Sequence, residues 1–180
     1  MDHHPYLRLT KGKLTTHTTT YTIRTLTKRL TANQPLYLLD DDGITANRPN
    51  YNTYQRLSTH ADLWIDAGPR SLDDAIDLIM AGATTLVIRP SLWPTLDTTD
   101  ILAITDCPLY IYYDHPDTPT PPYATGLIIP NTTPPAFLPL SLIHLPRYLL
   151  ALDSTIPLPD DPAYTGAFLD LSPVPSPEEP

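Results

Sequence analysis

The chain of 180 residues carries 20 acidic and 11 basic side chains, and its net charge of −9 argues against a nucleic-acid-binding protein. Its 6 Gly and 23 Pro exclude collagen-like and glycine-rich linker architectures, and no apolar run approaches the length of a membrane span. Cys107 is the single cysteine, so no intrachain disulfide can form, and a cytoplasmic location is expected.

Eight short runs of apolar or β-branched residues predict β-strands. They lie at residues 6–10, 36–40, 62–66, 84–88, 108–114, 125–129, 141–145 and 165–171. The apolar residues in these runs are mostly continuous rather than alternating, which is typical of strands that are covered on both faces.

Helices are predicted between the first strands, at residues 19–34, 50–60, 71–82 and 93–105. The helix over 71–82 has the clearest signals, because Ser71 suits the N-cap, Asp73 and Asp74 suit the first turn, and Gly82 suits the C-terminal stop. The second half differs, since proline-rich connectors follow residues 114 and 129 and only residues 147–152 predict a further helix.

This alternation of strands and helices predicts an α/β fold, a reduced (β/α)8 TIM-like barrel over residues 1–171 with its helices largely missing in the second half. A flavodoxin-like open parallel sheet is the alternative, because TIM barrels usually have roughly 250 residues. The proline-rich acidic tail, residues 172–180, is expected to be extended or disordered.

Polar residues follow several predicted strands, where parallel α/β folds carry their chemistry. Asp40, Asp66, Arg89 and Asp114 all come at such ends. Asp114 is the best candidate for an acid or base, because it directly follows a long apolar strand, although capping and loop roles are alternatives for every Asp. A metal site built from Asp40, Asp66, Asp114 and His115 has no recognisable ligand spacing, so neither a metal nor a cofactor is expected.

The turn Gly68-Pro69-Arg70-Ser71 leads into the predicted helix over 71–82. Free N–H groups at a helix N-terminus attract anions, and the planar fork of Arg70 suits phosphate or carboxylate. A tight turn with a Ser cap and an exposed Arg is the alternative. Arg89 would be a second anion contact or a salt-bridge partner.

Three segments carry a family resemblance: LYLLDDDGI at 36–44, A-G-P-R-S at 67–71 and V-I-R-P at 87–90. With a weaker match at 6–14, they resemble the phosphoribosylformimino-aminoimidazole carboxamide ribotide isomerase of histidine biosynthesis and its cyclase relative. The likeness is closest to an archaeal branch of isomerase-related proteins. The resemblance implies a barrel that binds a phosphorylated substrate and uses two aspartates, one on the first strand and one at the end of the fifth.

This chain departs from that pattern at two places. Arg8 stands where the first aspartate is expected, while Asp114 retains the second, and residues 141–150 lack the glycine turn that would hold a second phosphate. The resemblance therefore implies a divergent enzyme that acts on or binds a small anionic metabolite, phosphorylated ones included, with Asp114 as the catalytic residue. Its substrate-binding residues would be Arg8, Asp40, Asp66, Gly68, Arg70, Ser71 and Arg89.

The alternative function is a catalytically degenerate barrel that serves as a binding or assembly partner. Missing helices would leave apolar strand surface uncovered, and another protein, in a homo- or hetero-oligomer, could cover it. Neither hypothesis predicts nucleic acid or a membrane as a partner.

Overall fold

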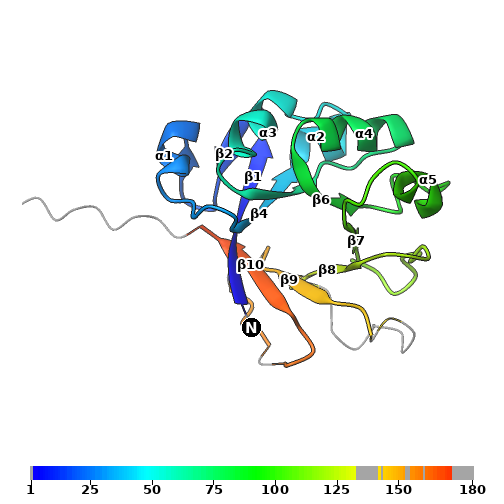
Figure 1. Ribbon diagram of the computed structural model, residues 1–180. Coiled ribbons are helices and arrows are strands. Elements are labelled where there is room, and N and C mark those ends of the chain that lie inside the picture. The colour runs from blue at the N-terminus through cyan, green and yellow to red at the C-terminus, as the bar shows by residue number, and fades with distance from the viewer. Residues whose placement is uncertain (1, 133–141, 143, 153–154, 160, 172–180) are drawn as a thin grey trace, which may run out of the picture.

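A computed structural model describes residues 2–132, 142, 144–152, 155–159 and 161–171. Eight parallel strands form its sheet (Figure 1): β1 (Asp2–Thr10), β4 (Pro35–Asp40), β5 (Asp62–Asp66), β6 (Ala83–Ile88), β7 (Leu109–Tyr112), β8 (Gly126–Pro130), β9 (Arg147–Leu150) and β10 (Gly166–Asp170). The last strand, β10, pairs with the first, from Asp2 opposite Gly166 to Tyr6 opposite Asp170. This closure confirms the reduced TIM-like barrel and excludes the open sheet.

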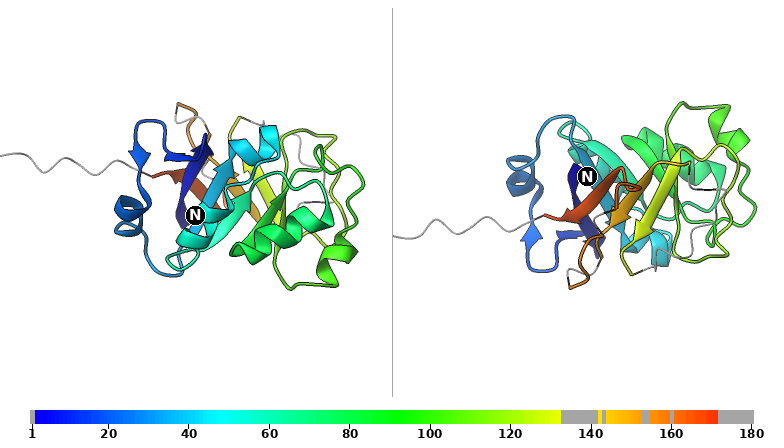
Figure 2. Two further views of the ribbon diagram at one scale, coloured as in Figure 1. Left: turned by 90° about the horizontal axis from the view of Figure 1, so that it is seen from above. Right: turned by 90° about the horizontal axis from the view of Figure 1, so that it is seen from below.

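Five short helices accompany the first half of the barrel: α1 (Ile23–Thr27), α2 (Asp41–Ala46), α3 (Tyr51–Leu57), α4 (Leu72–Met80) and α5 (Thr98–Leu102). In the part of the chain that the structure describes, no α-helix follows α5. Figures 1 and 2 show the helices on the side of the earlier strands. None of the described helices has the length and apolar character that a membrane crossing requires.

The helix predicted over 19–34 is wrong for most of its length. A small antiparallel extension, β2 (Lys13–Thr15) and β3 (Thr20–Tyr21), continues from β1 and takes up the start of that segment. Thr22 then caps α1 in a reciprocal arrangement with Thr25, and the helix ends at Thr27. The many β-branched threonines explain this, because they favour strands and caps over helix interiors.

The helix predicted over 93–105 starts five residues later than expected. Trp93 and Pro94 lie outside the helix, and the carboxylate of Asp97 accepts a hydrogen bond from the Thr99 N–H to cap α5. In contrast, α2 was not predicted. It forms because Asp40, at the end of β4, caps the N–H groups of Asp42 and Gly43.

The seventh barrel strand lies at 147–150, where a helix was predicted, and not at 141–145. Leu142, His144 and Leu145 are outside any strand, while residues 141 and 143, like the tail at 172–180, lie outside the described residues. Periodicity cannot distinguish a short buried strand from a helix, and here pairing with both β8 and β10 decides the conformation.

The strands of the second half are not left uncovered, contrary to the expectation for a helix-poor barrel. The outward-facing side chains of Leu127, Ile129 and Leu149 are at most 4% exposed. Leu145 and Leu158, from the connecting loops, pack against the same cluster. Among the described residues, leucines that lie outside the strands therefore help to bury this face of the barrel.

Candidate functional site

Aromatic rings fill the inside of the barrel. The inner cluster consists of Tyr6, Tyr37, Leu39, Trp64, Val87, Tyr110, Tyr112, Ile128, Leu150 and Phe168. The centre of the Trp64 ring lies 4.5 to 5.1 Å from the ring centres of Tyr110, Tyr148 and Phe168. The interior is thus a packed core, as in other TIM barrels, and any site must lie at the rim where the strands end.

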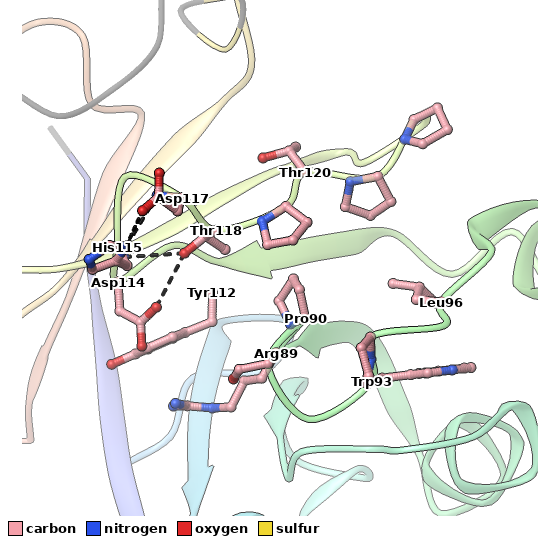
Figure 3. Close-up of a pocket in the computed structure, with 15 residues that line it drawn as sticks. Arg89, Pro90, Trp93, Leu96, Tyr112, Asp114, His115, Asp117, Thr118 and Thr120 are labelled. Atoms are coloured by element: carbon pink, nitrogen blue, oxygen red, sulfur yellow. Dashed lines mark hydrogen bonds and ion pairs between the residues drawn. The ribbon is translucent and has the colours of Figure 1, made fainter.

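A cavity of about 510 Å³ opens at that rim, between the connection that follows β6 and the connection that follows β7 (Figure 3). It is lined by Arg89, Pro90, Ser91, Trp93, Pro94, Leu96, Tyr112, Asp114, His115, Asp117, Thr118, Pro119, Thr120, Pro121 and Pro122. Its volume is in the range that small-molecule sites occupy. The carboxyl ends of barrel strands are also where TIM-barrel enzymes carry their active sites.

The connection that follows β7 forms one wall of the cavity, and several hydrogen bonds hold it in place. The Tyr113 hydroxyl donates to the Pro116 carbonyl at 3.1 Å, and the buried Thr98 hydroxyl on α5 donates to the Pro122 carbonyl. Thr125 and Leu109 close the loop at its base through two hydrogen bonds. Four prolines within residues 113–124 further restrict the backbone, so this wall is preformed.

Arg89 lies at the floor of the cavity and is held by a buried carboxylate. Its Nε and Nη2 atoms donate to the two oxygens of Asp66 at 2.8 and 2.7 Å, and the Tyr37 hydroxyl donates to the same carboxylate at 2.8 Å. Burial disfavours the guanidinium charge, but Asp66 outweighs this effect and raises the pKa of Arg89. Arg89 therefore stays charged beneath the cavity.

Tyr112 stacks on that guanidinium. The centre of its ring lies 3.6 Å from the Arg89 Cζ atom, which is a close cation–π contact. Burial raises the pKa of the Tyr112 hydroxyl, and Arg89 opposes part of this effect. The pair forms a rigid boundary between the filled barrel interior and the cavity.

Asp114 follows β7 and reaches the cavity as an exposed side chain. The Thr118 hydroxyl lies 3.4 Å from its Oδ1 atom (Figure 3). The next residue, His115, lies 3.5 Å from an oxygen of Asp117. Asp114 thus occupies a position from which its carboxylate can contact a bound molecule, and its catalytic role stays a prediction.

Arg8 is not among the cavity residues, and a carboxylate of the chain itself contacts it. Its Nε and Nη2 atoms donate to Asp41 at 3.2 and 3.1 Å, and the Thr10 hydroxyl donates to the same carboxylate at 2.7 Å. A guanidinium at this position was expected to bind an anionic substrate group. In the structure the anion is the first residue of α2.

Asp40 is fully buried and accepts six hydrogen bonds. Their donors are the backbone N–H groups of Asp42, Gly43 and Asn50, the Asn50 amide twice, and the Tyr54 hydroxyl. These contacts join β4, α2 and α3. Asp40, like Asp66, faces the protein and is not among the cavity residues.

The turn from Gly68 to Ser71 is occupied by contacts within the chain. The Arg70 guanidinium donates to the carbonyl oxygens of Gly43, Ile44 and Gly68 and to the Asn47 amide oxygen, at 2.7 to 3.2 Å. Arg70 thereby caps the C-terminus of α2.

The N-terminus of α4 is capped in the same way by its own residues. The Asp74 carboxylate accepts a hydrogen bond from the Arg70 N–H, and Ser71 accepts one from the Asp74 N–H. An anion at this turn would have to compete with the Asp74 carboxylate, so phosphate binding there stays a prediction.

Of the eight predicted site residues, the cavity brings together Arg89 and Asp114. Sequence reasoning missed Tyr112. Tyr112 was detectable in principle, because it lies two residues before Asp114 in the predicted strand over 108–114 and side chains two apart in a strand face the same way. Among the described residues, no group of three or more His, Cys, Asp or Glu side chains is placed to hold a metal ion.

Comparison of the sequence with protein-family models and with curated proteins found no match.

Proposed function

We propose that this protein is a divergent, isomerase-like barrel that binds a small anionic metabolite in the cavity between the β6 and β7 connections. The observation that carries the proposal is the convergence of Arg89 and Asp114, from two neighbouring strands, on one preformed cavity at the carboxyl rim of the barrel. A buried cation can hold an acidic group of the ligand, and a neighbouring carboxylate can exchange a proton with it.

Arg89 is suited to the first of these tasks. A guanidinium has five N–H donors, and Asp66 accepts hydrogen bonds from two of its nitrogens. The Nη1 atom, which Asp66 does not contact, is the donor that a ligand in the cavity would use. Since Asp66 and Tyr112 fix the plane of the guanidinium, a carboxylate or phosphate would meet it at little cost in side-chain entropy.

Asp114 is suited to the second task, proton transfer. It is accessible from the cavity, and the resemblance to ribotide isomerases implies an acid or base at this strand end. A doubly phosphorylated ribotide has less support as the ligand, because Arg70, Ser71 and Asp74 satisfy each other at the turn that would hold one phosphate.

Thermal unfolding with a panel of phosphorylated and carboxylated metabolites tests the proposal. A ligand at 100 times its dissociation constant stabilises the folded state by about 2.7 kcal/mol. Ser91→Trp, which fills the cavity from an exposed lining position, should abolish the increase in unfolding temperature that the ligand causes. Asp114→Asn should preserve binding, since it removes a negative charge beside the anion, and should abolish any turnover of the ligand.

Asp106→Asn is the matched control for Asp114→Asn, because Asp106 is an exposed aspartate outside the cavity. If a ligand still raised the unfolding temperature of Ser91→Trp, it would bind outside the cavity, and this would contradict the proposal. The alternative function, a degenerate barrel that acts as an assembly partner, loses the support that it drew from uncovered strands, because the outward-facing Leu127, Ile129 and Leu149 are buried.

A further inference from the structure

The cavity has two chemically different ends. In Figure 3, Asp114, His115 and Asp117 lie together at one end, and Trp93 and Leu96 lie at the other. Tyr112, Arg89 and Pro90 lie between these ends. A ligand that spans the cavity must therefore be amphipathic, with one polar end and one apolar end.

The apolar end offers few hydrogen-bonding groups. Besides Trp93 and Leu96, the cavity is lined by five prolines, which are Pro90, Pro94, Pro119, Pro121 and Pro122. Proline has no backbone donor, and its ring presents only carbon atoms. Sugar hydroxyls buried against such a wall would lose hydrogen bonds to water without replacing them, at a cost of roughly 1–3 kcal/mol for each unpaired group.

Trp93 is a fixed part of this wall. Its indole is only 7% exposed and packs in the outer core, and its backbone N–H is bonded to the carbonyl oxygens of Arg89 and Pro90 at 3.3 and 3.2 Å. A rigid aromatic and proline surface favours flat apolar groups, since their burial gains about 25 cal/mol for every Å² removed from water.

The polar end limits the charge of the ligand. Arg89 supplies one positive charge, and Asp66 already compensates it. Asp114 and Asp117 add two carboxylates to the cavity wall. A second acidic group on the ligand would meet these carboxylates without a further cation among the lining residues, apart from His115 when it is protonated.

We infer that the ligand is a compact compound with a flat apolar ring and a single acidic group, whose ring packs against Trp93, Leu96 and the prolines and whose acid contacts Arg89. This inference rests on the proposed function, because it takes the cavity as the binding site. It narrows the substrate class from small anions in general to compounds that carry one acidic group on an apolar ring.

Isothermal titration calorimetry with three probes separates the preference for an apolar ring from the proposed binding of an anion in the cavity. Phenyl phosphate carries a ring and an acid, ribose 5-phosphate carries the same acid on a hydroxylated body, and inorganic phosphate carries the acid alone. We expect phenyl phosphate to bind at least 10-fold more tightly than either of the others. Leu96→Ser should weaken the binding of phenyl phosphate at least 5-fold. Leu102→Ser, on the exposed side of α5 and outside the cavity, is the control and should leave this affinity unchanged.

Each other result has a distinct meaning. Ribose 5-phosphate binding as tightly as phenyl phosphate, with both lost in Ser91→Trp, would overturn the ring preference and leave the proposed function intact. Phenyl phosphate binding that is unchanged in Leu96→Ser would also overturn the inference, because the ring would then lie elsewhere. Absence of binding by all three probes at millimolar concentration would count against both proposals.

Discussion

Arg8 and Asp41 form an ion pair with two hydrogen bonds at the rim of the barrel, between the first strand and the first residue of α2. The resemblance to ribotide isomerases gives the position of Arg8 to a catalytic aspartate. The positive charge of Arg8 is not left for a substrate, because Asp41 compensates it within the chain. This pairing explains how a barrel of this kind can hold an arginine at its mouth.

Breaking that pair should create an anion site. In Asp41→Asn, Arg8 loses its carboxylate partner and its side chain, 42% exposed, becomes available to solutes. We expect inorganic phosphate to stabilise the variant by about 1 kcal/mol more than the wild type at five times its dissociation constant. Urea unfolding with and without phosphate at constant ionic strength measures this. Equal phosphate effects in both proteins would show that Asp41 does not limit access to Arg8.

Asp66 and Arg89 form a buried pair whose loss should be costly. Asp66 is fully buried, so Asp66→Asn leaves the Arg89 charge without compensation in a site from which water is largely excluded. We expect a decrease of about 3–5 kcal/mol in the free energy of unfolding, measured by urea denaturation.

The double variant Asp66→Leu with Arg89→Met is the control for the Asp66 prediction. It removes both charges, so it should recover much of the stability that Asp66→Asn loses. If the double variant were no more stable than Asp66→Asn, loss of packing rather than an uncompensated charge would be responsible.

Arg70 should contribute to stability and not to ligand binding. Its guanidinium donates to three carbonyl oxygens and one amide oxygen around α2, so Arg70→Ala leaves helix-terminal carbonyls without their partner. We expect a loss of about 1–3 kcal/mol in the free energy of unfolding. Ligand dissociation constants from calorimetry should stay within about twofold of wild type. A selective loss of phosphate binding with unchanged stability would instead support the anion role predicted from the sequence.

His4 should make stability depend on pH in mildly acidic solution. It packs near the rings of Phe168 and Tyr148, at 5.7 and 6.2 Å between ring centres, and burial lowers its pKa below 6.5, with Asp2 opposing and His3 adding to the effect. The unfolded chain therefore binds a proton at a higher pH than the folded protein. The stability from neutral His4 is complete above pH 6.5 and decreases as the pH falls toward the lowered pKa.

Urea unfolding at pH 8, 6.5 and 5.5 tests this dependence. One proton gives a slope of at most about 1.4 kcal/mol per pH unit. His4→Gln should reduce the change in the free energy of unfolding between pH 6.5 and 5.5. It should leave the difference in that free energy between pH 8 and 6.5 unchanged. An identical profile in the variant would assign the acid sensitivity to other groups.

The parallel barrel could be predicted because its strands are buried on both faces and therefore form continuous apolar runs. The same property explains the error at β9, since residues 147–150 have an apolar run that fits either a strand or a helix until neighbouring strands pair with it. The helix at 71–82 was predicted because its cap, first turn and stop are local signals. The helix at 19–34 was not correctly predicted, because pairing of Tyr21 with Leu14 depends on a contact outside the segment.

The candidate site was only partly accessible to sequence reasoning. The position of Asp114 at a strand end is a local property, so it was found. Whether an arginine is available to a ligand depends on which carboxylate reaches it, and the partners of Arg8 and Arg89 lie 33 and 23 residues away. Those distances in sequence explain why the partners could not be named beforehand. Both arginines were predicted as substrate contacts, with a salt bridge as the alternative for Arg89. The structure shows each in an ion pair, but only Arg89 also lines the cavity.

The strand that begins the barrel also completes it. The first half of β1 pairs with β10, and the second half pairs with β4, so closure joins segments from nearly opposite ends of the sequence. During synthesis, β4 to β9 can assemble while β1 still lacks its last neighbour, and the nascent sheet carries two unpaired edges until residue 170 has left the ribosome. Such edges promote association between chains, so we expect the pairing of β10 with β1 to limit both the rate and the yield of folding.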